Sequence, residues 1–328
     1  MGTTNHVPDK MTAQREQVVE SLIDAMQRDG LSWSRGWASV ASPHNFASGR
    51  PYHGINRLYL AYRAHVGGFN DPRWVTPKQA LEIAAQRGET WDFAGEACTW
   101  VEWPVMRDVI ACDEAGNPIV NPDTGKPEVS GQRLVGMKYH KVLNLAQIKG
   151  APAYELPASS DGDFDAAQSI IDSYFPASGC GFEEAASIAT PCYSPARDKV
   201  FMPSRNLFVS SEEFASTLAH ETIHSTGAAK RLDRSMEGLF GSADYAYEEL
   251  IAELGSVMLC SDLGFAYAPG EASLENHAAY LSGWMKALSS GKGFEILRKA
   301  QVASDRAATY VLGFLSGKET SYMKSRPD

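Results

Sequence analysis

Two histidines separated by three residues form the part of the chain best suited to chemistry. They lie in the pentad His220-Glu221-Thr222-Ile223-His224, which has the pattern H-E-x-x-H. On a helix, residues four apart share a face, so both imidazoles can reach one metal ion while Glu221 lies beside it. This arrangement is typical of zinc hydrolases. We therefore predict that His220 and His224 bind Zn²⁺, one ion per chain, and that Glu221 is catalytic.

The local sequence predicts that this pentad lies in a helix from about Ser211 to Thr226. Ser210 followed by Glu213 has the spacing of a capping box, and Gly227 is a natural stop. The helix carries one apolar stripe, formed by Phe214, Leu218 and Ile223.

A second helix is expected to supply the third metal ligand. Residues 244–260 fit, with Asp244 as the cap and Gly264 as the stop. Three of its carboxylates are candidates: Glu248, Glu249 and Glu253. Any one of them completes a set of two histidines and one glutamate, and the pattern indicates only that one points at the metal; we favour Glu249, with Glu253 and Glu248 as alternatives. If Glu249 binds the metal, Glu253, one turn on, is placed to hydrogen-bond a ligand imidazole.

These residue types predict the chemistry of a metallopeptidase. Zinc held by the two histidines polarises a scissile carbonyl and lowers the pKa of water toward neutrality. Glu221 is expected to take the proton of that water and pass it to the leaving amine. The oxyanion needs a further donor, and four residues remain open for that role: Tyr193, Tyr245, Tyr247 and Arg231.

Length and composition predict a soluble two-domain protein. The 328 residues exceed a usual single core, and 44% are hydrophobic. No apolar run of membrane length and no leader-like start occur, so a cytoplasmic protein with no membrane contact is expected. The five cysteines lack a C-x-x-C pair, which leaves zinc to histidine and carboxylate.

The charge divides the chain into two halves. Of its 30 basic and 40 acidic residues, 16 of each lie in residues 1–150, which leaves 14 and 24 in residues 151–328. We expect an N-terminal α+β domain over 1–150, a linker rich in Pro, Ala, Ser and Gly over 151–163, and a second domain over 164–328.

The remaining elements follow from periodicity and turn residues. Helices are expected at residues 11–28, 76–86 (with Thr76 as cap and Pro77 first), 164–175, 273–288 and 294–315. Strands are expected at 97–105 and 134–143, joined by a turn-rich excursion, and at 184–190 and 199–202, with 192–198 turning between them. An extended peptide substrate could pair with the edge of the strand just before the metal helix.

Aromatic and basic residues alternate in residues 31–78, where Asp71 is the one acid. Aromatic faces stack on unpaired bases and arginines neutralise phosphates, so this mixture is typical of single-stranded DNA binding. On composition alone, however, packing in the core of a small domain explains these aromatics slightly better.

Motifs along nearly the whole chain resemble the ArdC-type antirestriction proteins of mobile elements, whose relatives include parts of plasmid primases and phage polyvalent proteins. They are Tyr52-His53-Gly54-Ile55-Asn56, Arg73-Trp74-Val75-Thr76, residues 141–148 and 198–203, the pentad with Ser225-Thr226-Gly227, residues 248–253 and residues 278–284. The resemblance implies a single-stranded DNA-binding domain followed by a zincin-like metallopeptidase domain with an unidentified protein or peptide substrate. It reverses the preference for simple packing, and the expected DNA contacts are Arg35, Trp37, Arg50, Tyr52, Asn56, Arg57, Arg73 and Trp74.

Three functions are compatible with these features. The first is an antirestriction-type protein that binds single-stranded DNA and carries a zinc peptidase site. The second is a DNA-protecting protein whose zinc site is structural or inactive. The third is an acidic DNA mimic, which is disfavoured because the acidic residues are spread along amphipathic helices rather than set in dense rows.

Overall fold

The computed structural model describes residues 7–29, 41–155, 163–234, 243–265, 267–268 and 277–316. Its helices are α1 Asp9–Asp29, α2 Ile55–Gly67, α3 Pro77–Arg87, α4 Asp163–Ser169, α5 Phe175–Ser178, α6 Ser211–Thr226, α7 Ala243–Leu263, α8 His277–Leu288 and α9 Gly293–Leu315. Its strands are β1 His44–Asn45, β2 Arg73–Val75, β3 Thr99–Ile110, β4 Val129–Asn144, β5 Gly181–Ala185, β6 Cys192–Ser194 and β7 Lys199–Pro203.

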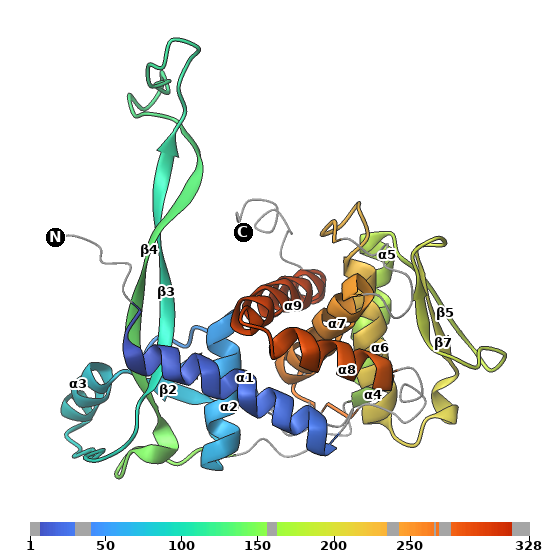
Figure 1. The fold of residues 1–328 in the computed structure, drawn as a ribbon, viewed down its shortest axis with the longest axis horizontal. Helices are drawn as coiled ribbons and strands as arrows, with labels where there is room; N and C mark the ends of the chain where they lie inside the picture. Colours follow the sequence, from blue (N-terminus) through green and yellow to red (C-terminus); the bar gives the residue numbers. More distant parts are fainter. Residues whose placement is uncertain are drawn as a thin grey trace.

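The N-terminal half is built on a four-stranded sheet with the order β1-β2-β4-β3. Only the base of this sheet packs against helices, where Trp74, Val101 and Val142 are buried. Beyond the base, β3 and β4 continue as a two-stranded antiparallel ribbon that projects far from the rest of the molecule (Figure 1).

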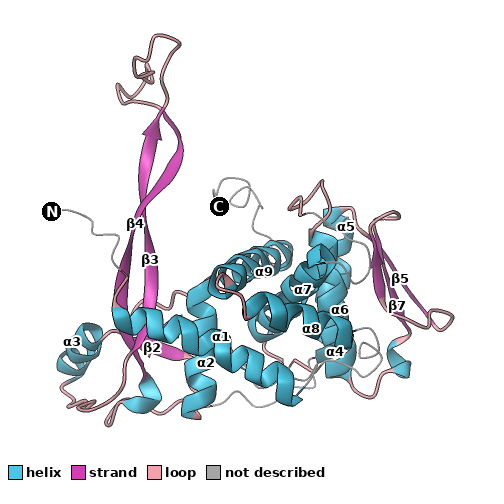
Figure 2. Ribbon diagram, viewed as in Figure 1, coloured by secondary structure: helices cyan, strands magenta, loops and turns pink. Residues whose placement is uncertain are grey.

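The C-terminal half is mainly helical. Helix α6, which carries the H-E-x-x-H pentad, lies against α7 and α9, and a small sheet with the order β5-β7-β6 borders this group on the side away from the hairpin (Figure 2). The buried core of this half includes Phe214, Leu218 and Ile223 of α6. The predicted apolar stripe of α6 therefore holds it in the core.

One buried cluster joins the two halves. It contains Met11 and Leu22 of α1, Tyr59 of α2, and Leu250 and Trp284 of the C-terminal helices α7 and α8. In the view of Figure 1, α1 runs below α8 and α9. The N-terminal helix thus completes the packing of helices that come more than 200 positions later.

Most of the predicted elements are present. Helix α6 has the predicted bounds, and α3 begins as expected with Pro77 first and a capping box between Thr76 and Gln79. The Ser210 side chain caps α6, but the Glu213 carboxylate accepts from the Val209 amide rather than closing a box with Ser210.

Other predictions were wrong in detail. The strand expected at 184–190 ends at Ala185, and Cys192–Ser194, expected in a turn, forms β6. Strand β7 is the central strand of its sheet, so the edge that faces α6 belongs to β6 instead. Asp244 lies inside the first turn of α7 rather than at its cap.

None of the helices within the described ranges is both long and apolar enough to cross a membrane.

Candidate metal centre

Three side chains converge where α6 packs on α7. His220 Nε2 and His224 Nε2 lie 3.1 Å apart. Glu249 Oε2 lies 3.5 Å from His220 Nε2, and Glu249 Oε1 lies 3.5 Å from His224 Nε2. All three residues are buried. The H-E-x-x-H pentad and the acidic run on the second helix therefore meet at one point.

The candidate ligand atoms lie close to the spacing that tetrahedral coordination of one metal ion requires. Bonds of about 2.0–2.2 Å to one zinc ion separate its ligand atoms by roughly 3.3–3.6 Å. The two Nε2 atoms are 3.1 Å apart, and each lies 3.5 Å from its nearer Glu249 oxygen, which agrees with this spacing to within a few tenths of an ångström. One atom from each of the three residues lies within 4.8 Å of the other two. His220, His224 and Glu249 therefore fit a divalent metal such as zinc.

The charge of the surrounding cluster also suits a cation. Four carboxylates are buried around the two imidazoles: Glu221, Glu248, Glu249 and Glu253. The guanidinium of Arg234 pairs with one of them, Glu248. With neutral imidazoles the cluster carries excess negative charge in a buried place, which a divalent ion offsets.

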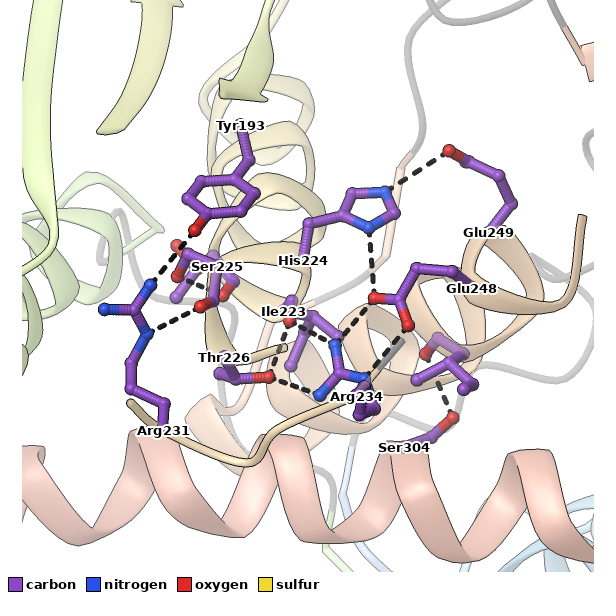
Figure 3. A network of polar contacts seen from close by, with 12 residues as sticks. Tyr193, Ile223, His224, Ser225, Thr226, Arg231, Arg234, Glu248, Glu249 and Ser304 are labelled. Atoms are coloured by element: carbon purple, nitrogen blue, oxygen red, sulfur yellow. Dashed lines mark hydrogen bonds and ion pairs between the residues drawn. The ribbon is translucent and has the colours of Figure 1, made fainter. Parts of the chain in front are cut away.

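Glu248 orients the second histidine. Its Oε1 lies 3.3 Å from His224 Nδ1, so an Nδ1–H that donates to it leaves the Nε2 lone pair facing Glu249. Arg234 donates to both oxygens of Glu248, at 3.0 and 2.7 Å, and also to the Thr226 hydroxyl and the Ile223 carbonyl of α6. Figure 3 shows this arginine tying Glu248 to the end of the metal helix.

Glu253 lies near Nδ1 of His220. Its Oε2 lies 3.7 Å from His220 Nδ1 and accepts a hydrogen bond of 2.8 Å from the Tyr267 hydroxyl. Burial, together with the nearby Glu253 charge, raises the pKa of Tyr267 and keeps its proton in place. The three candidate glutamates therefore occupy three different places around the histidines.

The pKa values of the two histidines and of Glu249 reflect the charges around them. Burial lowers the pKa of His224, but the Glu249 charge and the Glu248 hydrogen bond outweigh it and raise the pKa to about 9. The pKa of His220 is also raised, because Glu249 and Glu253 outweigh the effect of burial. Burial raises the pKa of Glu249, whereas the two imidazoles lower it below its usual range. Without metal, the carboxylates favour protons on the histidines.

Glu221 lies on the side of α6 that faces the small sheet. Its Oε2 accepts a hydrogen bond of 2.6 Å from the backbone amide of Tyr193 in β6. Since β6 is at the edge of its sheet, this amide points out of the sheet toward α6 rather than toward β7. The outer edge of β6 therefore borders the candidate site.

Two of the four residues considered as oxyanion donors are engaged elsewhere. The Tyr193 hydroxyl donates to Asp198 at 2.8 Å and accepts from Arg231 at 3.1 Å. Arg231 also pairs with Asp198 and donates to the Ser225 carbonyl, and its side chain is 1% exposed (Figure 3). This network connects β6 to the C-terminal end of α6. Tyr245 and Tyr247 are partly buried beside the cluster shared by the two halves.

The residues expected to contact DNA are mostly integrated into the fold. Trp74 is fully buried, Asn56 exchanges two hydrogen bonds of 2.7 Å with the Glu102 backbone, and Arg57 donates to Asp262 at 2.9 Å. Arg73 pairs with Asp71, Tyr52 is half-buried and Arg50 is exposed. Arg35 and Trp37 lie outside the described residues. Their contact with DNA stays a prediction, and Arg50 is the one of the described six with an exposed side chain.

Sequence reasoning missed two supports of the site. Arg234 and Tyr267 come from segments outside the two metal helices and reach the histidines through Glu248 and Glu253. A basic residue shortly after the H-E-x-x-H helix was visible in the sequence, but its partner depends on how the chain returns to α7.

Comparison with known proteins agrees with this geometry. Residues 12–138 match the N-terminal domain of the anti-restriction factor ArdC, and residues 170–301 match a zincin-like metallopeptidase family. The chain belongs to the ArdC antirestriction family. Its two-part α+β architecture is the ArdC arrangement of an N-terminal domain followed by a zincin-like domain.

Solved ArdC structures are similar over almost the whole chain. The metal-free crystal structure of antirestriction ArdC from plasmid R388 has a TM-score of 0.65 and 27% identity, covering 93% of this chain and 98% of that one. The Mn(II)-bound structure of the same protein has a TM-score of 0.65 and 26% identity, covering 93% of this chain and 99% of that one.

Sequence relatives include longer proteins. Two DNA primases TraC of Escherichia coli are 32% and 33% identical over 91% of this chain, which spans only 20% and 27% of their lengths. The uncharacterized protein y4eC of Sinorhizobium fredii is 30% identical, over 92% of this chain and 94% of its own length. ArdC-like chains thus occur both alone and as a segment of larger proteins.

Proposed function

We propose that this ArdC-family protein is a zinc-dependent peptidase that also binds single-stranded DNA. The observation that carries the peptidase is the convergence of His220, His224 and Glu249, with Glu221 beside them on α6. Two histidines and one glutamate leave a position open for water or substrate, as catalytic zinc sites do. The Mn(II)-bound ArdC structure supports a divalent metal in this family.

The residues of the chain divide the work of hydrolysis. Bound zinc supplies Lewis acidity, which polarises a carbonyl and makes a neighbouring water more acidic. Glu221 accepts the proton of the attacking water and delivers it to the leaving amine nitrogen as the peptide bond breaks. Glu248 and Glu253 hold the imidazoles in the required tautomer and orientation, so that the metal ligands do not reorganise.

The edge of β6 is the proposed place of the substrate backbone. An extended peptide adds to an exposed strand edge through main-chain hydrogen bonds. The Tyr193 amide already points toward α6 and is held by Glu221. A peptide carbonyl that takes over this amide frees Glu221 for water, which couples substrate binding to the availability of the base.

The DNA-binding part of the proposal rests on the family and on the chain's relatives. The N-terminal half matches the ArdC N-terminal domain, and TraC primases, which are DNA enzymes by name, contain a segment similar to this chain. We propose that DNA binding brings the peptidase site to a protein near the strand of an incoming mobile element.

Protection of incoming DNA tests this function without knowledge of the peptide substrate. Transfer of an unmodified plasmid into a restricting host is measured with wild type, Glu221→Gln and His224→Ala at equal protein levels. A peptidase predicts that both variants lose protection. If Glu221→Gln protects as well as wild type, the chain is a DNA-protecting binding protein whose metal site is structural.

A further inference from the structure

The hairpin of β3 and β4 presents two chemically different faces. Side chains alternate between faces along a strand, and residues directly opposite one another on paired strands share a face. Trp103 is paired with Lys138 and Arg107 with Arg133, and Trp103 and Arg107 are four positions apart on β3. Between these pairs the register shifts, because β4 has one extra residue, Val135, and this shift places Arg133 on the same face as Lys138. All four side chains therefore lie on one face of the ribbon, which we call the basic face.

The basic face is exposed and carries positive charge only. Trp103 is 58% exposed, and Arg107, Arg133 and Lys138 are also exposed. No described residue forms a hydrogen bond or an ion pair with any of these three cations. A large aromatic surface and three cations are thus free to meet a partner.

The acidic residues of the hairpin lie elsewhere. Asp108 is paired with Gln132 on the opposite face and accepts its hydrogen bond at 2.7 Å, and Glu102 is buried at the base. The other acids of the hairpin lie in the loop at its tip, residues 111–128. The middle of the ribbon is therefore positive on one side, although the hairpin as a whole is not basic.

One feature of this face has no structural explanation. Arg107 and Arg133 are directly opposite each other on the ribbon, and like charges in that position destabilise a strand pair. Gly136 and Gly131 stand opposite Val105 and Val109 on the same face, so one strand lacks side chains there and its backbone is accessible. Two arginines without an acidic partner among the described residues do not stabilise the strand pair. Together with the accessible backbone beside them, they favour binding of a polyanion.

We infer that the basic face of the hairpin is a binding site for single-stranded DNA, a proposal that rests on the DNA-binding part of the proposed function. Trp103 stacks on an unpaired base, and Arg107, Arg133 and Lys138 neutralise phosphates of the same strand. The projection of the ribbon gives a flexible strand access along its length (Figure 1). An acidic protein surface would satisfy the cations but would leave Trp103 without a planar base to stack on.

Fluorescence anisotropy with a 5′-labelled oligothymidine of 20 nucleotides, measured over a salt series, tests this site. Trp103→Ala is expected to weaken binding by about 10-fold with little change in the salt dependence, because it removes one stacking contact. The double variant Arg107→Gln/Arg133→Gln is expected to lower the slope of log affinity against log salt by about 1.4, since each phosphate contact on a single strand contributes about 0.7.

Matched controls separate a binding role from a structural one. Lys126→Gln removes one charge from the hairpin tip and is expected to bind like wild type. The double arginine variant is expected to unfold at the same temperature as wild type or slightly higher, because it relieves a like-charge pair. A drop in its unfolding temperature would contradict the binding role of these arginines.

The outcomes also separate this proposal from the proposed function. If wild type binds the oligonucleotide and all hairpin variants bind equally well, the hairpin site is wrong while DNA binding stands. If wild type does not bind, DNA binding itself is wrong. If only the arginine variant is weakened, the face is a general polyanion contact and base stacking by Trp103 is contradicted.

Discussion

Three glutamates within six residues of α7 take three different positions around two histidines. Glu249 faces the Nε2 atoms of both, Glu248 lies next to Nδ1 of His224, and Glu253 lies beyond Nδ1 of His220. Adjacent helix residues point about 100° apart, which lets Glu248 and Glu249 reach opposite sides of one imidazole. The same spacing places Glu253 one turn from Glu249.

The Arg234 contact is expected to set metal affinity from outside the ligand set. Arg234→Gln leaves Glu248 without its two charged hydrogen bonds, so Glu248 no longer fixes the His224 ring. Loss of such outer support typically weakens metal binding by about 10- to 100-fold. Titration against a chelating dye measures this change. Unchanged metal affinity in a folded Arg234→Gln protein would show that Glu248 fixes the His224 ring without the contact to Arg234.

The metal-free protein is expected to lose stability as pH rises from about 6.5 to about 9. The folded-state pKa of His224 is raised to about 9, above its unfolded value near 6.5. The proton on His224 therefore stabilises the folded state. This stabilisation is complete below about pH 6.5 and is lost as the pH rises through the folded-state pKa. Thermal unfolding with a chelator present measures the trend, and His224→Ala should flatten it. A chelated wild type that gains stability over this range would contradict the expected charge balance.

At the residue scale, the spacing in the sequence pointed to the three residues that converge and to Glu253 beside them, but not to Arg234 or Tyr267. The spacing of His220 and His224 is a local property of one helix, so it can be read without the fold. The contacts of Arg234 and Tyr267 depend on where loops return to the site, which no local pattern encodes.

The close packing of α6 on α7 depends on one glycine. A Cβ added to Gly255 would lie 2.9 Å from Ile223 Cγ2, and Ile223 is the residue before His224. Ile223 is branched at Cβ, so its Cγ2 methyl has little freedom to move. Gly255 therefore sets the distance between the helix that carries the histidines and the helix that carries the glutamates.

Gly255→Ala is expected to destabilise the protein by about 1–2 kcal/mol, because overpacking outweighs the gain in helix propensity. In an Ile223→Ala background the clash is absent, so the same substitution should be neutral or stabilising. Denaturant unfolding of the four proteins forms a double-mutant cycle. Equal effects of Gly255→Ala in both backgrounds would show that these helices are not in tight contact there.

At the element scale, prediction succeeded where local signals end a helix. Ser210 and Gly227 bound α6 at the predicted residues, because caps are local. The strands of the hairpin run further than predicted, to Ile110 and from Val129, because their outer parts are exposed on both faces and show no hydrophobic alternation. Strand β6 is three residues long and is defined by pairing with β7, which its own sequence does not reveal.

The two halves of the molecule are held together by a shared core and by a buried arginine. Arg57 of α2 donates to Asp262 and to the Met258 carbonyl of α7, and its side chain is 8% exposed. Arg57 was expected to contact DNA, whereas in the fold it bridges the halves. The predicted domain boundaries at 150 and 163 rest on composition, which cannot show such contacts across the linker.

Thermal unfolding is expected to occur in one cooperative transition, since the N-terminal helix α1 shares a core with α7 and α8. Arg57→Ala should lower the stability of the whole chain by about 3 kcal/mol, because it leaves Asp262 without its cationic partner and with only the Ser42 hydroxyl as a side-chain donor among the described residues. Calorimetry measures both. Two separate transitions, with only one affected by Arg57→Ala, would show that the halves fold independently.

Metal content of the purified protein tests the central claim most directly. Mass spectrometry of wild type, Glu221→Gln, His224→Ala and Glu249→Ala gives the identity and amount of bound metal. We expect one zinc ion per chain in wild type and in Glu221→Gln, and none in the two ligand variants while they remain folded. A wild type without a divalent ion, or a folded Glu249→Ala that keeps its full metal content, would contradict the site described above.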